Sequence, residues 1–135
     1  MKRKGFTLVE MLLVLAVLGV LMSLGTYGMQ RYVKTLRLSE SAHKVQSFLA
    51  QARNQAIKRS EAAYVDVGGN TLRLYDGNDQ LKKTLNLPYR SQVAPGTRVY
   101  FTGRGLPDHQ YVFTVQLGDR NRSVVLLPTG KVVIP

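Results

Sequence analysis

The stretch Lys2-Arg3-Lys4-Gly5-Phe6-Thr7-Leu8-Val9-Glu10, followed by the run from Met11 to Gly25, decides how the rest of the chain is interpreted. Three cations precede Gly5, and the residues from Phe6 onward are apolar or small, with Glu10 as the single charge. About twenty such residues form roughly 30 Å of helix, which is enough to cross the hydrocarbon core of a membrane. The cations favour the cytoplasmic side, so the predicted topology has the N-terminus inside and the remainder outside.

A secretory signal peptide also has a charged start followed by an apolar run. Here the small residue Gly5 precedes the apolar run instead of following it, and no A-x-A cleavage site occurs near residues 22–30. A carboxylate inside an apolar span is costly in lipid, so Glu10 indicates a function that involves a partner. These features favour a helix that is retained.

The segment from Lys4 to Glu10 resembles the class III signal of type IV pilins and type II secretion pseudopilins. The resemblance implies that a prepilin peptidase cuts between Gly5 and Phe6 and methylates the amine of Phe6. It also implies that Glu10 pairs with the N-terminal amine of a neighbouring subunit, since an ammonium stabilises a carboxylate held in lipid. The alternative is a plain signal anchor that happens to contain a glutamate. The pilin resemblance implies an assembly subunit and not an enzyme.

Composition limits the remaining residues to one small domain. The chain has 135 residues and no cysteine, so disulfides and thiolate chemistry are excluded. Removing the three leader cations from the 19 basic residues leaves 16 against 8 acidic ones, a formal net charge of +8. This excess predicts attraction to polyanions, either nucleic acid or anionic lipid headgroups, without choosing between them.

The helix is expected to continue beyond the membrane, because no proline occurs before Pro88. We expect a leader at residues 1–5, a transmembrane and assembly helix at 6–28, an amphipathic helix at 29–60 and a β-rich part at 61–135. Apolar residues at helical spacing predict a stripe that faces a sheet, formed by Val45, Phe48, Leu49, Ala52, Ala56 and Ile57. The opposite face is expected to carry the cations Arg31, Lys34, Arg37, Lys44, Arg53, Lys58 and Arg59.

After Ser60 the pattern changes from helical spacing to alternation. Alternating segments between turn residues predict strands at 62–67, 71–75, 81–87, 98–102, 111–117, 123–127 and 131–134. Residues 89–96 are expected to form a loop and residues 118–122 a turn. The predicted fold class is therefore α+β and pilin-like, with a long N-terminal helix, half of it transmembrane, packed on one or two antiparallel sheets.

Three later segments narrow the resemblance to the GspH/FimT group of minor pseudopilins and minor pilins: residues 50–59, 99–105 and 123–132. The resemblance implies a subunit that primes or caps a filament. It also implies, for some FimT-like members of DNA-uptake systems, DNA binding through a G-R-x-R motif in the C-terminal tail. The equivalent stretch here, Gly130-Lys131-Val132-Val133, keeps one cation and lacks the second.

Other cations offer a second route to DNA. The candidate patch, which would bind phosphates without sequence preference and weaken steeply with salt, consists of Arg98, Arg104, Arg120, Arg122 and Lys131. The alternative is that these cations keep the surface soluble and balance Asp108 and Asp119. Five tyrosines could stack bases or could pack within strands: Tyr64, Tyr75, Tyr89, Tyr100 and Tyr111.

Metal binding and catalysis are not predicted. His43 and His109 lack companions at metal-ligand spacing. The segment Asp76-Gly77-Asn78-Asp79 groups hard oxygens, but it lacks the terminal glutamate of a calcium loop, so a turn is expected. No spacing suggests a nucleophile–base pair or paired carboxylates. We therefore expect no cofactor. The expected partners are other pilin subunits, a prepilin peptidase, the inner membrane that the chain spans once before it enters a filament, and, in the DNA hypothesis, DNA.

Overall fold

The structure is a computed structural model that describes residues 6–94 and 96–135, without the side chains of residues 24–27. Its first element is helix α1 (Leu8–Arg59), and a 3-10 turn, η1 (Pro88–Arg90), lies between two of the strands. The strands are β1 (Ala63–Gly68), β2 (Thr71–Asp76), β3 (Leu81–Asn86), β4 (Gln92–Val93), β5 (Thr97–Phe101), β6 (Tyr111–Leu117), β7 (Arg120–Leu126) and β8 (Val132–Val133). The chain divides into two compact units, one ending at Lys34 and one from Thr35 to Pro135.

The first unit is the N-terminal part of α1. The backbone N–H of Glu10 donates to the Thr7 hydroxyl at 3.3 Å, and that of Met11 donates to the Thr7 carbonyl at 3.2 Å. Thr7 is therefore the N-cap of the helix, and Glu10 lies in the first turn, where the helix dipole favours a carboxylate. This part of α1 is long and apolar enough to cross a membrane, by length and composition.

The second unit is built around the C-terminal part of α1. The predicted apolar stripe is confirmed at Val45, Phe48, Leu49, Ala52 and Ala56, which are all buried, and it extends back to Leu38 and Ala42. The prediction was wrong for Ile57, which is 42% exposed. Ile57 lies at the last turn, where the chain that crosses it is Gly105, a residue without a side chain to cover it.

Arg53 was also misplaced by the sequence pattern. It was expected on the solvent face, but it is half-buried, and its Nε donates to the carbonyl of Gly105 at 3.1 Å. The long side chain covers apolar surface with its methylenes while its guanidinium satisfies a loop carbonyl. Arg53 thus fixes the loop after β5 to the helix.

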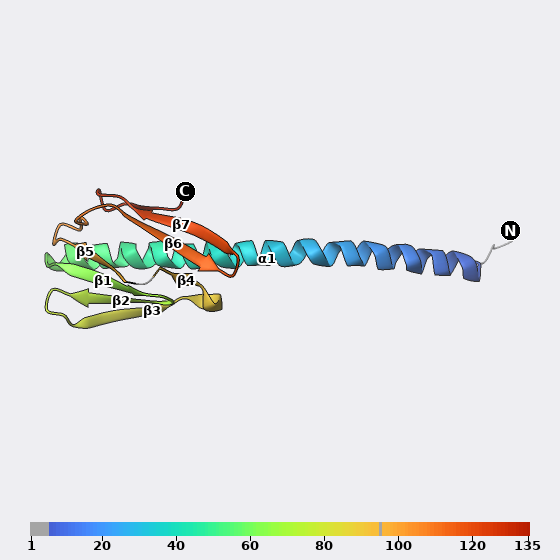
Figure 1. The fold of residues 1–135 in the computed structure, drawn as a ribbon, viewed down its shortest axis with the longest axis horizontal. Coiled ribbons are helices and arrows are strands. Elements are labelled where there is room, and N and C mark those ends of the chain that lie inside the picture. Colours follow the sequence, from blue (N-terminus) through green and yellow to red (C-terminus); the bar gives the residue numbers. More distant parts are fainter. Residues whose placement is uncertain (1–5, 95) are drawn as a thin grey trace. The chain divides into compact units, whose positions relative to one another are not determined.

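Two four-stranded antiparallel sheets pack on the helix of this unit, in the orders β3-β2-β1-β5 and β4-β6-β7-β8 (Figure 1). One continuous core joins α1 to both sheets through inward residues such as Val65 and Leu74 of the first sheet and Val115 and Val124 of the second. The prediction of an α+β fold with a long helix on antiparallel sheets is confirmed.

Two connections differ from the predictions. Leu117 pairs with Arg120, so the turn is reduced to Gly118-Asp119, and Arg120 and Arg122 lie in β7 instead of in a turn. The segment 89–96 is not a plain loop, because it contains the end of η1 and the short strand β4, which pairs with β6. Both differences come from pairing with distant strands, which local sequence does not reveal.

Gly105 and Gly130 allow two loops and the helix to meet. Both have positive φ, +73° and +78°. A Cβ on Gly130 would lie 2.6 Å from both Arg53 Nε and the carbonyl oxygen of Gly105. A side chain there would therefore separate the C-terminal strand from the helix.

We expect Gly130→Ala to lower the free energy of unfolding by at least about 2 kcal/mol, because it combines left-handed strain with a clash. The matched control is Gly69→Ala, which has a similar φ of +64° but no atom within 4 Å of its Cβ, and it should cost about 1 kcal/mol. Urea unfolding of the full chain in detergent measures both. Equal losses would show that the close approach does not matter.

Candidate functional site

The predicted processing site lies at the N-terminal end of the helix. Gly5 is outside the described residues, whereas Phe6 is described, is 71% exposed and precedes the N-cap. Glu10 is exposed one helical turn after Phe6. A cut between Gly5 and Phe6 would thus create an amine close to the start of the helix and one turn before the carboxylate.

The helix that follows exposes apolar side chains. From Phe6 to Met22, the large apolar residues with exposed side chains are Phe6, Leu8, Val9, Met11, Leu12, Leu13, Val14, Leu15, Val17, Leu18, Val20, Leu21 and Met22. Such a continuous apolar surface is not stable in water and marks a contact with lipid or with other proteins. Glu10 is the one charged side chain within the run from Phe6 to Met22.

The five candidate DNA-binding cations fall into separate groups. Arg120 and Arg122 lie at the start of β7, where Arg120 Nη1 donates to the Thr35 hydroxyl and Arg122 Nη1 donates to that of Ser39 at 3.0 Å. Lys131 lies beyond the other end of β7, where its carbonyl accepts from Leu127 N. Because β7 has seven residues, its two ends are roughly 20 Å apart.

The remaining two cations lie elsewhere. Arg104 belongs to the loop that meets the β7–β8 turn at Gly105 and Gly130, so it is on the same side of the unit as Lys131. Arg98 is on β5 in the other sheet, with its Nε 3.8 Å from Asp66 Oδ1. The structure therefore places Arg120 and Arg122 side by side on β7, puts Arg104 and Lys131 in two loops that meet, and does not form one patch from all five cations.

Three of the five tyrosines form a row on the outer face of the first sheet. Tyr64 pairs across the strands with Tyr75 and Tyr100, and its ring is stacked on Tyr75 with 4.9 Å between centroids. Arg98 Cζ lies 4.8 Å from the centroid of the Tyr64 ring. The Tyr64 hydroxyl donates to Asp79 at 2.6 Å, and this hydrogen bond raises the pKa of Tyr64 to about 12. The Tyr64 ring is used within the protein, which favours packing over base stacking.

Asp76 explains the turn that resembled a calcium loop. It is buried, its Oδ1 accepts from the backbone N–H of Asn78 at 3.1 Å and of Gln80 at 2.9 Å, and its Oδ2 accepts from Lys82 Nζ at 2.8 Å. These contacts occupy the carboxylate oxygens with turn amides and an ammonium. Within residues 6–94 and 96–135, no group of three or more His, Cys, Asp or Glu residues is placed to hold a metal ion.

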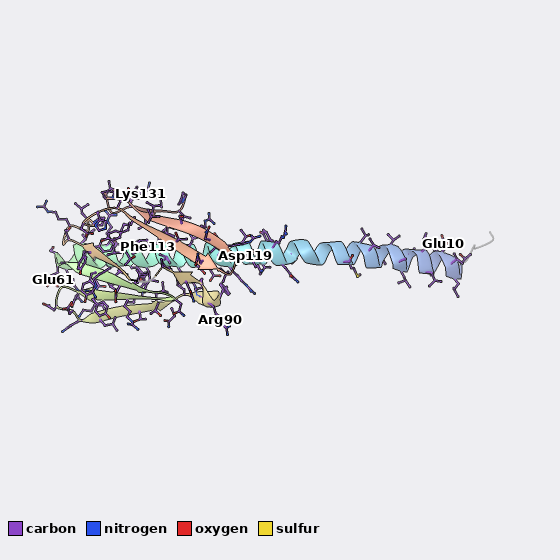
Figure 2. All side chains as sticks on the ribbon, viewed as in Figure 1. Glu10, Glu61, Arg90, Phe113, Asp119 and Lys131 are labelled. Atoms are coloured by element: carbon purple, nitrogen blue, oxygen red, sulfur yellow. The ribbon has the colours of Figure 1, made fainter. Side chains whose placement is uncertain are left out.

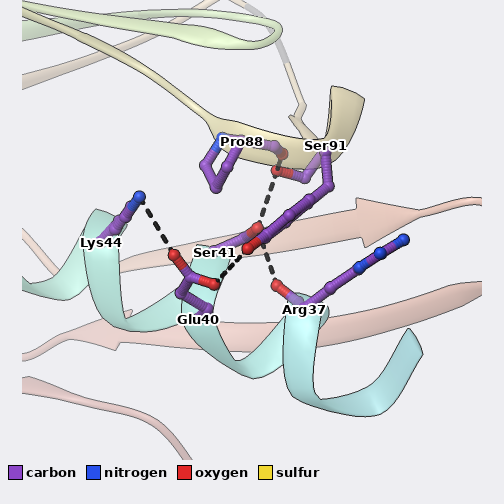
Figure 3. A network of polar contacts seen from close by, with 7 residues as sticks. Arg37, Glu40, Ser41, Lys44, Pro88 and Ser91 are labelled. Carbon is purple, nitrogen blue, oxygen red and sulfur yellow. Dashed lines mark hydrogen bonds and ion pairs between the residues drawn. The ribbon is translucent and has the colours of Figure 1, made fainter. Parts of the chain in front are cut away.

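A polar network that the sequence pattern missed lies on the helix near Thr35 (Figure 3). The Tyr89 hydroxyl donates to Glu40 Oε2 at 2.7 Å, and Lys44 Nζ lies 3.2 Å from Glu40 Oε1. The Cζ atom of Arg37 lies 5.1 Å from the centroid of the Tyr89 ring. The Tyr89 hydroxyl and then Lys44 lower the pKa of Glu40.

A buried contact holds the η1 turn to the helix beside this network. The Ser91 hydroxyl donates to the hydroxyl of Ser41 at 2.9 Å, and both residues are fully buried. Ser41 occupies a core position next to Ala42, and a buried polar group requires a polar partner. A serine at a core position of the apolar stripe therefore indicates, from the sequence alone, that a polar segment packs against it.

Comparison with known proteins agrees with this architecture. Residues 41–130, more than half of the chain, match the family described as type II transport protein GspH, and residues 1–26 match the prokaryotic N-terminal methylation motif. The chain belongs to the GspH family. It is a subunit of the minor pilin and pseudopilin type, as the resemblance in the sequence implied.

Two solved structures share the fold of this GspH-family chain. The type IV minor pilin FimU of Pseudomonas aeruginosa PAO1 has a TM-score of 0.65 at 12% identity, covering 77% of this chain and 92% of FimU. The minor pseudopilin EpsH from the type 2 secretion system of Vibrio cholerae has a TM-score of 0.54 at 15% identity, covering 73% of this chain and 96% of EpsH. No curated protein sequence matches the chain.

The role of Asp76 predicts how stability depends on pH. Lys82, and then the backbone N–H of Gln80, lower the pKa of Asp76 from its ordinary value of 3.8. The ionised carboxylate therefore stabilises the fold above that value, and the contribution is lost as the pH falls through the lowered pKa.

We expect Asp76→Asn to reduce stability at neutral pH and to flatten the loss of stability at acid pH. Thermal unfolding of the full chain in detergent between neutral and strongly acid pH measures this. Lys131→Gln, which removes an exposed lysine from the turn before β8, should leave the acid profile as in the wild type. A profile for Asp76→Asn that parallels the wild type would exclude this role.

Proposed function

We propose that this GspH-family subunit is inserted in the inner membrane through residues 6–28 and enters a filament through the same helix. The peptidase cuts between Gly5 and Phe6, the new amine is methylated, and the domain from Thr35 to Pro135 lies outside the cytoplasm. In the filament the subunit primes or caps assembly, and no catalytic step is needed for this role.

The observation that carries the proposal is the division of α1 into two surfaces. From Leu38 to Ala56 its apolar face is covered by two sheets, whereas from Leu8 to Met22 its large apolar side chains are exposed all round the helix. A helix that is apolar all round is stable in lipid or among other apolar helices. The same surface therefore fits the membrane first and the helices of neighbouring subunits afterwards.

Glu10 has two physical roles that an experiment can separate. Thr7 and Glu10 are spaced as a capping box, so Glu10 contributes to the helix start whatever it meets in a filament. In the proposed assembly its charge also attracts the methylated amine of a neighbouring subunit in a medium of low dielectric, where such an attraction is strong. Glutamine serves a capping box as glutamate does, but it has no charge.

We expect Glu10→Gln to reduce incorporation into filaments at least about tenfold, which corresponds to a lost interaction of roughly 1.4 kcal/mol or more. Thr7→Ala is the matched control, because it removes the cap and keeps the charge, and it should assemble nearly as the wild type does. Quantitative immunoblotting of sheared filaments and of membranes, from cells that express the cognate system, gives the ratio. Normal assembly of Glu10→Gln would refute the charge pairing.

DNA binding stays a second hypothesis. Because the candidate cations lie in separate groups, each group can be removed and tested by itself. Each pair, Arg120 with Arg122 or Arg104 with Lys131, would contribute about two phosphate contacts, so its removal should lower the salt slope of binding by about 2. Gel shifts of the full chain in detergent with duplex DNA, for the wild type and for each double alanine variant, measure the slopes. The absence of a shift at low salt would remove this role.

A further inference from the structure

A basic surface lies at the end of the globular unit where α1 enters it. We call it the proximal surface, and it consists of Arg37, Tyr89, Arg90, Arg120 and Arg122. Figure 2 shows Arg90 and Asp119 at this end of the unit and Glu61 at the other. Four arginines thus lie at this end of the unit, Arg120 and Arg122 against Thr35 and Ser39 on one side of the helix, and Arg37 and Arg90 beside Tyr89 on the other.

One half of the proximal surface is fixed by the β6–β7 hairpin. Arg120 and Arg122 are two residues apart on β7, so both side chains point to the same side, toward the helix, where they donate to the hydroxyls of Thr35 and Ser39. These bonds fix the guanidinium groups against the helix instead of leaving them on mobile side chains. An arginine carries five N–H donors, and the hydrogen bond from Arg122 Nη1 to Ser39 uses one of them, so the guanidinium fork can still bind an oxyanion.

The other half is fixed by the η1 turn. Tyr89 and Arg90 both have left-handed φ values, 58° and 57°, although neither is a glycine. Two consecutive residues in this conformation are costly, and such strain persists where surrounding contacts impose it. Here the buried Ser91–Ser41 hydrogen bond anchors the turn, with the result that Tyr89 is 44% exposed and Arg90 is exposed.

The charge of Glu40 is already offset within the protein. Its carboxylate accepts from Tyr89 and pairs with Lys44 at 3.2 Å. The guanidinium of Arg37 meanwhile lies over the Tyr89 ring, which leaves its positive charge at the surface. The proximal surface is therefore cationic, with an exposed tyrosine ring among the arginines.

Chain continuity limits how far this surface is from the predicted span. Seven residues join Gly28 to Thr35, which is roughly 10 Å of helix and at most about 25 Å of extended chain. Tyrosine and arginine are the residues that favour the interface between lipid and water, where the ring lies at the level of the headgroups and the guanidinium binds phosphate.

We propose that the proximal surface docks on the phosphate groups of anionic phospholipids in the membrane that holds the N-terminal helix. The inference rests on the proposed membrane insertion of residues 6–28 and adds to it a lipid-binding surface on the globular unit. Docking orients this unit on the membrane in the state that precedes assembly. Each cation near an anionic surface strengthens such docking roughly fivefold at low salt.

The absence of cysteine from the sequence allows a direct test with single-cysteine spin labels. The full chain is reconstituted in nanodiscs of phosphatidylglycerol with phosphatidylcholine, or of phosphatidylcholine alone. The reporter is Asn121→Cys, an exposed position that lines the same hollow as Thr35, Arg120 and Arg122, and the reference is Thr129→Cys, an exposed position in the turn before β8. Accessibility to a neutral nickel chelate, measured by power-saturation EPR, reports immersion at the membrane surface.

We expect the label at Asn121 to be shielded in the anionic discs, and to become as accessible as that at Thr129 in neutral discs or at high salt. The variant Arg37→Gln/Arg90→Gln/Arg122→Gln should reduce the docked-to-undocked ratio about a hundredfold, at roughly fivefold per cation. The same three positions changed to lysine should keep most of the docking. The matched control, Lys58→Gln/Arg59→Gln/Lys83→Gln, removes three exposed charges outside this surface and should dock as the wild type does.

The outcomes separate this proposal from the proposed function. If the chain does not co-purify with the discs, the proposed membrane span is wrong, and the proposed docking, which depends on it, is wrong as well. If the chain co-purifies but Asn121 is equally accessible in both lipids, or if both triple glutamine variants behave alike, the docking surface is wrong and the span stands. If the proximal triple variant loses a duplex-DNA gel shift while lipid has no effect on Asn121, the surface binds nucleic acid and not lipid.

Discussion

Both sheets bury their inner faces against the same stretch of α1, and this shared contact is the constraint on which the domain depends. Between Leu38 and Ala56 the buried face of the helix combines small residues, Ala42, Ala52 and Ala56, with larger ones such as Leu49. The sequence contains no cysteine, so packing of this helix must hold the two sheets together without a disulfide. From Leu8 to Met22 the same helix has exposed large apolar side chains, which fit the proposed assembly through this segment.

Much of the fold follows from periodicity. The apolar stripe on the helix and the alternating segments after Ser60 were sufficient to predict an α+β arrangement. The errors occurred where distant segments decide the environment of a residue: Arg53 is drawn inward by the Gly105 carbonyl, and Ile57 is left exposed where a glycine crosses it. Strand β4 has two residues and exists because β6 lies beside it, so no local pattern could have indicated it.

The candidate functional residues also differ in whether the sequence alone could identify them. The processing motif and Glu10 are contiguous in sequence, so they could be recognised without a structure. The cations could not be grouped, because strand register places Arg122 opposite Val115 at one end of β7 and Lys131 beyond the other end. The proximal surface depends on the Ser41–Ser91 hydrogen bond, which joins residues 50 positions apart. The sequence does not show that Arg37 lies over the ring of Tyr89, because that contact also joins distant segments.

The proposed role of this GspH-family chain requires that its N-terminal helix is processed and then used for assembly. This requirement can be checked by measuring the intact mass of the protein recovered from filaments of its own cells and by sequencing its N-terminal peptide. We expect a chain that begins at Phe6, lacks the first five residues and carries one methyl group on its amine. A protein from the same filaments that still begins at Met1, with Lys2 to Gly5 in place, would contradict it.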